Sequence, residues 1–291
     1  MTGRTAKRGF VLVMVLVVLA VAGSLLAAVA HRTTLRSAQA GEARSALQRK
    51  WAFRSLQAVC FARAEEMLKE DTTDLAPPPV TARRRLSLGG TEFTVIVADE
   101  QAKANVNLVA ARRDKDGLRA CVSALSGGGW TLQVIPRPVE EKSAAIRSVP
   151  MRYASLEQVF FGVKGPMDLL GAEMRGGPAE KLTAWGNGKV NFRRAEASVL
   201  REALEGVLDE YEVHHLVTLR EAMPSAGLSD ILKQLDLKKE TLAEAEKSLV
   251  DASACHSVWI VAGGKTRQWH RLYVRQEGDA ENDAGSWILD W

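Results

Sequence analysis

The stretch RGFVLVMVLVVLAVAGSLLAAVA, Arg8 to Ala30, decides how the chain is organised. From Phe10 onward it holds 21 residues without a charge, and a helix of that length, rising ~1.5 Å per residue, spans the ~30 Å hydrocarbon layer of a membrane. Basic residues, including Arg4 and Lys7, precede it, so the positive-inside rule predicts a cytoplasmic amino terminus and an exported body. The predicted membrane-spanning residues include Val11, Leu12, Val13, Met14, Leu16, Leu19, Leu25 and Leu26.

This stretch has three alternative interpretations. The first is an uncleaved anchor, and the second is a secretory signal peptide cut after the small-x-small sequence Ala28-Val29-Ala30. The third is a prepilin-type leader cut between Gly9 and Phe10. In the third case the whole apolar helix stays on the mature protein. The run is longer than the usual apolar core of a signal peptide, which argues against the second.

The sequence after Ala30 favours the cut at Gly9. From Thr33 to Glu70 there is no proline, only one glycine, and an excess of good helix formers, so the apolar helix is predicted to run on as a soluble one. An apolar stripe at helical spacing predicts that this extension packs against the following domain. The stripe consists of Ala46, Phe53, Leu56, Cys60, Ala64 and Met67.

The sequence of the exported body predicts an antiparallel sheet interrupted by helices. Alternating apolar residues on both sides of Gly89-Gly90 predict a hairpin, and the same alternation in 257–262, 267–274 and 286–291 predicts C-terminal strands. Between them, an i, i+4, i+8 pattern predicts one amphipathic helix from Glu196 to Tyr211. The expected fold class is therefore α+β.

Composition excludes several functions. A net charge of +4, with 39 basic and 35 acidic residues that are mostly dispersed, predicts no nucleic-acid partner. No P-loop, GxSxG or GxGxxG motif is present, and His214-His215 lacks the companion ligands of a metal site, so we expect no enzyme. Asp114 and Asp116 lack the glycine and distal glutamate of a calcium loop and indicate a charged turn. The disulfide state of Cys60, Cys121 and Cys255 stays open.

The leader, the apolar helix and its helical continuation together resemble type IV pilin-like proteins. Most of these carry a glutamate at the fifth mature position, where this chain has Met14. Absence of that glutamate is a hallmark of the K-type minor pseudopilins of type II secretion, the general secretion pathway protein K family. Two further stretches, DEQAKANVNLV and GKVNFRRA, resemble that family's motifs, although Phe192-Arg193 replaces its usual second asparagine. The matching motif residues are Asn105, Asn107, Val190, Asn191 and Ala195.

The resemblance implies a structural tip subunit that helps to start pseudopilus assembly. Its implied partners are the other minor pseudopilins, the major pseudopilin, prepilin peptidase and the inner membrane, with the body in the periplasm. No cofactor is evident, and calcium is implied by the resemblance alone. The implied fold is pilin-like, with an inserted all-helical domain: leader 1–9, transmembrane helix 10–30, pilin-like helix and first strands 31–107, insertion 108–250 and final strands 251–291. The alternatives are a minor pilin of a type IV pilus or competence system and, from another class, an anchored exported binding module or hydrolase.

Overall fold

The computed structural model describes residues 5–69, 78–126, 130, 153–163, 166–171, 176–263, 268–277 and 287–290. Contacts divide the chain into two units, Met1–Arg54 and Ser55–Trp291.

The first unit is helical throughout its described part. Helix α1 runs from Thr5 to Ala62, so the apolar stretch and the soluble extension form one continuous helix, as the sequence predicts. Among the described residues, α1 is the helix that is long and apolar enough to cross a membrane. No residue in its most apolar stretch is buried.

In the second unit the helical extension continues on the sheet. A turn at Arg63 separates the end of α1 from α2 (Ala64–Lys69), and the guanidinium of Arg63 donates to both carboxylate oxygens of Glu66 at 2.6 and 2.7 Å. Leu56, Cys60 and Leu68 are buried, and α2 contacts the first two strands of the sheet. Of the predicted stripe, Phe53, Leu56, Cys60 and Ala64 are buried and Met67 is half-buried, whereas Ala46 is exposed.

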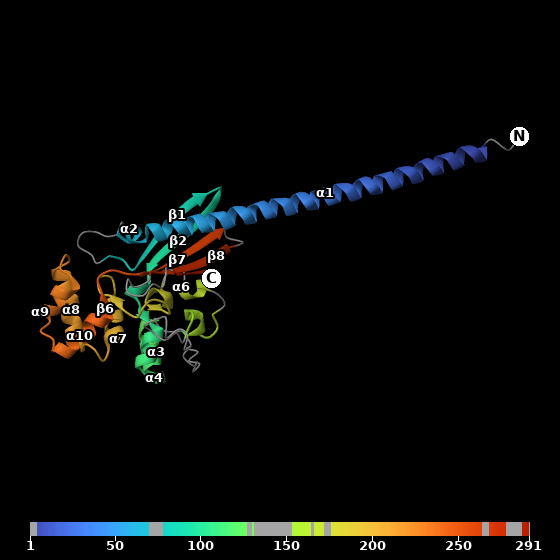
Figure 1. Cartoon of the computed structure of the whole chain (residues 1–291). Coiled ribbons are helices and arrows are strands. Elements are labelled where there is room, and N and C mark those ends of the chain that lie inside the picture. The colour runs from blue at the N-terminus through green and yellow to red at the C-terminus, as the bar shows by residue number, and fades with distance from the viewer. Residues whose placement is uncertain are drawn as a thin grey trace. The chain divides into compact units, whose positions relative to one another are not determined.

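Within the described residues the sheet has five strands in the order β1-β2-β7-β8-β9, all antiparallel, and Figure 1 labels the first four. The strands are β1 (Thr81–Leu88), β2 (Thr91–Asp99), β7 (Cys255–Gly263), β8 (Gln268–Gln276) and β9 (Trp287–Asp290). The hairpin between β1 and β2 turns at Gly89 and Gly90, whose φ angles of 59° and 77° need residues without a Cβ penalty. The predicted hairpin and C-terminal strands are confirmed.

The two faces of the sheet are covered differently. Ile96, Trp259 and Leu272 join the large apolar core of the segment inserted between β2 and β7. Phe93 and Val95 point to the opposite face, because side chains alternate along a strand, and they are also buried. Trp259 is thus a core residue, whereas the side chains of Trp287 and Trp291 lie outside the described residues.

The segment between β2 and β7 is mainly helical. Its helices are α3 (Val106–Arg112), α4 (Lys115–Leu125), α6 (Pro166–Leu170), α7 (Ala197–Leu204), α8 (Glu210–Ala222), α9 (Leu228–Gln234) and α10 (Lys239–Ser248), with short 3-10 turns η1 (Glu100–Ala102), η2 (Leu156–Gln158) and η4 (Pro178–Glu180). Two parallel strand pairs accompany them: β3 (Ala104–Asn105) with β4 (Leu182–Thr183), and β5 (Val190–Asn191) with β6 (Leu249–Val250). The predicted α+β class, with a helix packed on an antiparallel sheet, is confirmed. The insertion is not all-helical as predicted, because the two strand pairs lie within it.

The single helix predicted from Glu196 to Tyr211 is wrong. Helix α7 ends at Leu204, Gly206 adopts a φ of 83°, and α8 starts after a capping box between Asp209 and Glu212. Tyr211 consequently lies in the first turn of a new helix and is exposed. The apolar repeat continues through this part of the sequence, but Gly206 and the N-cap Asp209 end one helix and start another.

Candidate functional site

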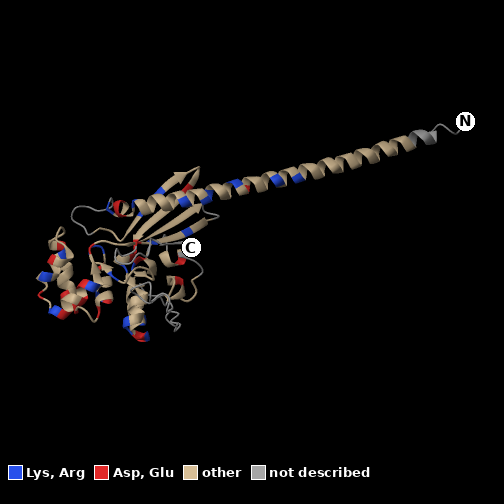
Figure 2. Cartoon of the chain, in the orientation of Figure 1, with Lys and Arg blue, Asp and Glu red and all other residues tan. Residues whose placement is uncertain are grey.

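The residues expected to be processed and to span the membrane all lie on α1. The eight side chains named for the membrane span are 57 to 72% exposed in the isolated chain, and Phe10 is 67% exposed. Figure 2 shows this part of α1 without charge, whereas Lys and Arg appear farther along the helix. A helix that is apolar on all sides is suited to lipid or to burial among other helices. Gly9 lies in the same helix, four residues after its first residue, Thr5.

A second group of candidate residues lies in the segment DEQAKANVN, which joins the sheet to the insertion. All six polar residues of this segment have 5% or less of their surface exposed. Buried polar groups cost free energy unless they are hydrogen-bonded, so their partners define what the segment does. The six are Asp99, Glu100, Gln101, Lys103, Asn105 and Asn107.

Asp99 anchors the end of β2. One carboxylate oxygen accepts from the backbone N–H groups of Gln101 and Ala102, at 2.9 and 3.1 Å, and so caps η1. The other accepts from Nδ2 of Asn191 at 2.7 Å and from Nη1 of Arg194 at 3.1 Å. The sequence motif residue Asn191 is therefore bonded to the end of a strand 92 residues earlier.

Arg194 links Asp99 to the helix that precedes the sheet. Its guanidinium donates to both carboxylate oxygens of Glu65, at 3.0 and 2.8 Å, while Nε2 of His256 lies 3.0 Å from Oε1 of the same carboxylate. The hydrogen bond with His256, followed by the bonds and charge of Arg194, lowers the pKa of Glu65 well below its usual range despite partial burial. Burial acts to lower the pKa of Arg194, but the bonds to Glu65 and the charge of Asp99 outweigh it and raise that pKa.

The group formed by Asp99, Arg194, Glu65, His256 and Asn191 is called the junction below. They come from α2, the end of β2, the turn after β5 and the start of β7. The junction thus joins four separate segments of the second unit. Its side chains form hydrogen bonds and ion pairs with one another, which is typical of a structural connection.

The first asparagine motif is also structural. Asn105 caps α3 by accepting from the backbone N–H groups of Asn107 and Leu108, and its Nδ2 donates to the carbonyl of Trp185 at 2.8 Å. Asn107 donates to the carbonyls of Tyr153 and Ala184 at 2.9 Å each and accepts from the Tyr153 N–H at 2.8 Å. Both asparagines hold together backbone segments that are far apart in sequence.

The second motif brings two strands and a helix together. Val190 is buried and pairs with Leu249 between β5 and β6. The carbonyl of Ala195, which has no exposed surface, accepts from Nη1 of Arg220 at 2.7 Å, as does the carbonyl of Phe192. The two stretches meet at Asp99, which accepts from Asn191 and Arg194, whereas Asn105 and Asn107 bond to other segments.

Sequence reasoning missed the buried charges. Lys103 and Glu100 form an ion pair at 2.6 Å with side chains 2% and 0% exposed, and the hydroxyl of Ser257 on β7 donates to the same carboxylate at 2.5 Å. No local pattern announces this burial, since a charged residue in a connecting segment is ordinarily solvated. In the sequence, the signal that could have indicated this burial is the close spacing of polar and small residues in DEQAKANVN.

No group of three or more His, Cys, Asp or Glu residues placed to hold a metal occurs within the described parts of the chain. The charged turn predicted at Asp114 and Asp116 is instead the start of a helix. Asp114 is the N-cap of α4 and accepts from the backbone N–H of Gly117 at 2.8 Å, and Oδ1 of Asp116, within α4, lies 3.4 Å from Nη1 of Arg119. The three cysteines are free and buried. Burial raises the pKa of Cys121 to about 12.

No protein-family model and no curated protein matches the chain. The structure is similar to a chain of the solved GspK-GspI-GspJ complex from the type 2 secretion system of enterotoxigenic Escherichia coli, with a TM-score of 0.49 and 14% sequence identity. The similarity covers 87% of this chain and 98% of that chain. At this TM-score and identity the likeness assigns neither a family nor a function.

Proposed function

We propose that the chain is a minor pseudopilin of a type II protein secretion system and acts by assembly rather than catalysis. The observation that supports this most is the continuity of α1. A single helix contains, from Phe10, an uncharged run that can cross a membrane, and near its end it carries the buried residues Leu56 and Cys60. A secretory signal peptide or a simple anchor has no need of such a fused helix.

A position at the tip of the pseudopilus is supported by Met14. A carboxylate inside a bilayer is costly unless a positive charge pairs with it, so a glutamate there serves a subunit that has a neighbour to neutralise. The described part of α1 from Phe10 to Ala30 carries no charge at all. A subunit at the tip has no neighbour above it and would therefore need no such glutamate.

The proposed partners follow from this role. The apolar part of α1 would pack against the helices of other minor pseudopilins and of the major pseudopilin, and the second unit would lie in the periplasm. Prepilin peptidase would cut after Gly9 and methylate Phe10. The assembled tip would start the pseudopilus that exports proteins across the outer membrane.

The test is the mass of the mature amino terminus, measured in cells with an active prepilin peptidase. We expect a chain that begins with N-methylphenylalanine at residue 10. An intact Met1 or a new terminus at His31 would refute the proposal. The matched variants are Gly9→Val, which should abolish the cut, and Ala30→Leu, which should abolish a signal-peptidase cut but leave the cut after Gly9 unchanged.

A further inference from the structure

The first charges after the apolar run of α1 are two arginines on one face of the helix. Arg32 and Arg36 are four residues apart, so their side chains lie one above the other. Both are exposed, and from Phe10 to Gly41 the sequence holds no other Lys, Arg, Asp or Glu. Figure 2 shows blue rather than red where the uncharged part of α1 ends. The end of the apolar run is therefore marked by positive charge alone.

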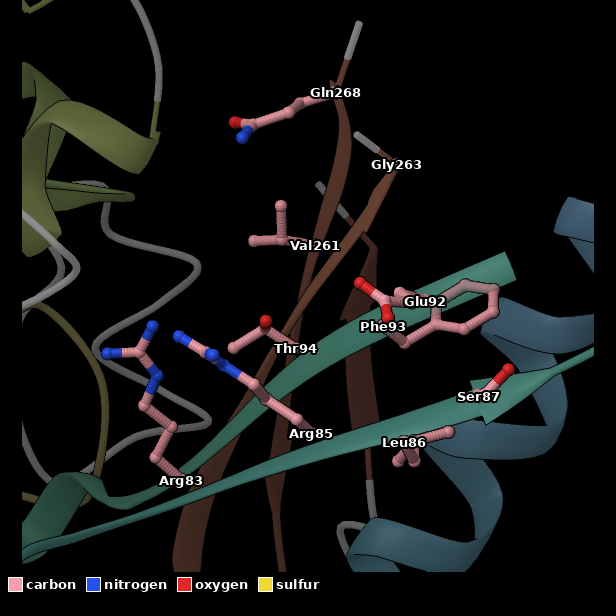
Figure 3. A pocket seen from close by; sticks show the side chains of 10 residues that line it. All are labelled: Arg83, Arg85, Leu86, Ser87, Glu92, Phe93, Thr94, Val261, Gly263 and Gln268. Atoms are coloured by element: carbon pink, nitrogen blue, oxygen red, sulfur yellow. The ribbon is translucent and has the colours of Figure 1, made fainter. Parts of the chain in front are cut away.

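Neither arginine has a carboxylate partner within the described residues. The positions three and four residues away from each, where a helical ion pair would form, carry no acid. Other arginines of the chain differ. Arg194 is bonded to two carboxylates, and Arg85 lines a hollow of about 390 Å³ on the sheet together with Glu92 (Figure 3). The guanidinium groups of Arg32 and Arg36 are thus available to an external anion.

The height of these arginines along α1 matches the lipid headgroups. At ~1.5 Å rise per residue, Arg32 lies ~3 Å and Arg36 ~9 Å beyond Ala30, where the uncharged run that spans the membrane meets the headgroup layer, which is ~5–8 Å thick on each side. Side chains on a helix lean toward its amino terminus, and that end of α1 points into the membrane. The long Arg36 side chain consequently reaches back into the headgroup layer, where lipid phosphates are the nearest anions.

We propose that Arg32 and Arg36 bind the phosphate of an anionic lipid headgroup and so fix the depth of α1 in the membrane. This inference rests on the membrane-spanning helix of the proposed function. A guanidinium binds phosphate with two parallel hydrogen bonds, and an anionic lipid, unlike a zwitterionic one, brings no positive group that competes for that phosphate. Acidic side chains of another protein suit the same charges, but the height of both arginines favours the lipid.

The experiment measures which lipid lies beside this end of the span. The full chain carries a fluorophore on Thr33→Cys, which is exposed, whereas the native cysteines are buried. It is reconstituted in phosphatidylcholine vesicles with nitroxide-labelled phosphatidylglycerol or phosphatidylcholine, and short-range quenching gives the relative affinity of the two lipids. We expect phosphatidylglycerol to be preferred at least fivefold. The preference should fall below twofold in the variant with Arg32→Gln and Arg36→Gln.

The matched control is Arg44→Gln, which removes an exposed arginine of the same helix ~21 Å beyond Ala30 and should leave the preference unchanged. Glycerol phosphate at the concentration of the anionic lipid should not lower the preference, because the proposed ligand is the lipid. Its loss to glycerol phosphate, or an equal preference in the double variant and the natural chain, would overturn the proposal. An unchanged preference with lost association between chains would assign the arginines to a protein partner instead.

Failure of this inference is distinguishable from failure of the proposed function. Equal quenching by both lipids in the natural chain would refute the lipid site but still place α1 in the membrane. Quenching by neither lipid would show that residue 33 does not lie at the headgroups, and would also refute the membrane-spanning helix. Quenching of the double variant by phosphatidylcholine, as in the natural chain, shows that the variant is inserted and that only its lipid selectivity has changed.

Discussion

Nη2 of Arg194 lies 2.8 Å from Oε2 of Glu65, although 129 residues separate the two in sequence. The Arg194 side chain is 4% exposed, and its other terminal nitrogen contacts Asp99, which is fully buried. One guanidinium therefore neutralises a carboxylate on α2 and another at the end of β2. The way the helix meets the sheet depends on this contact.

Replacing Arg194 should destabilise the second unit strongly. Arg194→Met leaves the buried carboxylate of Asp99 without its positive partner, and breaking a buried ion pair in this way costs about 3–5 kcal/mol. Urea unfolding of the full chain in detergent, followed by tryptophan fluorescence, measures the change. Arg201→Met is the control, since this exposed arginine should alter the free energy of unfolding by less than about 0.5 kcal/mol. Equal effects of the two substitutions would contradict the assigned role of Arg194.

Acid should weaken the contact between Glu65 and its partners. The pKa of Glu65 is lowered in the folded state, so its contribution is complete above the unfolded value of ~4.3 and is lost as the pH falls through the lower folded value. Glu65→Gln should therefore be less stable than the natural chain at pH 7, with a difference that shrinks on acidification. Urea midpoints at pH 7 and pH 3 measure this, and a difference independent of pH would argue that the carboxylate charge is not what matters.

Asn107 should be intolerant of apolar replacement. Asn107→Leu leaves two carbonyls and one N–H without their partner in a buried site, and each such group costs about 1–3 kcal/mol. Thermal denaturation of the full chain in detergent would show the loss. Ser198→Ala, which removes one exposed hydroxyl, should leave the melting temperature nearly unchanged. A stable Asn107→Leu chain with lost assembly would instead favour a binding role for this asparagine.

A charge in the middle of the apolar run should impair membrane insertion. Leu19→Asp costs about 2.5–3.5 kcal/mol at the centre of a spanning helix. The fraction of chain resistant to alkaline carbonate extraction should fall accordingly. Leu47→Asp is the matched control, because Leu47 is similarly exposed on α1 but lies outside the apolar run. Equal extraction of both variants would show that the run does not reside in the membrane.

Much of the fold is predictable because its signals are local. The charge-free run after Gly9, the helix formers that follow it and the Gly89-Gly90 turn each act over a few residues, and all three yield the expected elements. The break at Gly206 escaped prediction because the apolar period continues on both sides of it. There a backbone conformation outweighed a side-chain pattern.

Composition and spacing alone show which part of the chain is apolar enough for a membrane and where apolar residues alternate in the strands. The roles of the polar residues are visible only in the folded chain. Asn107, Asn191 and Glu65 meet partners 46 to 191 residues away. Hydrogen bonds over such separations depend on how the strands and the insertion fold back on one another, and no local pattern encodes them.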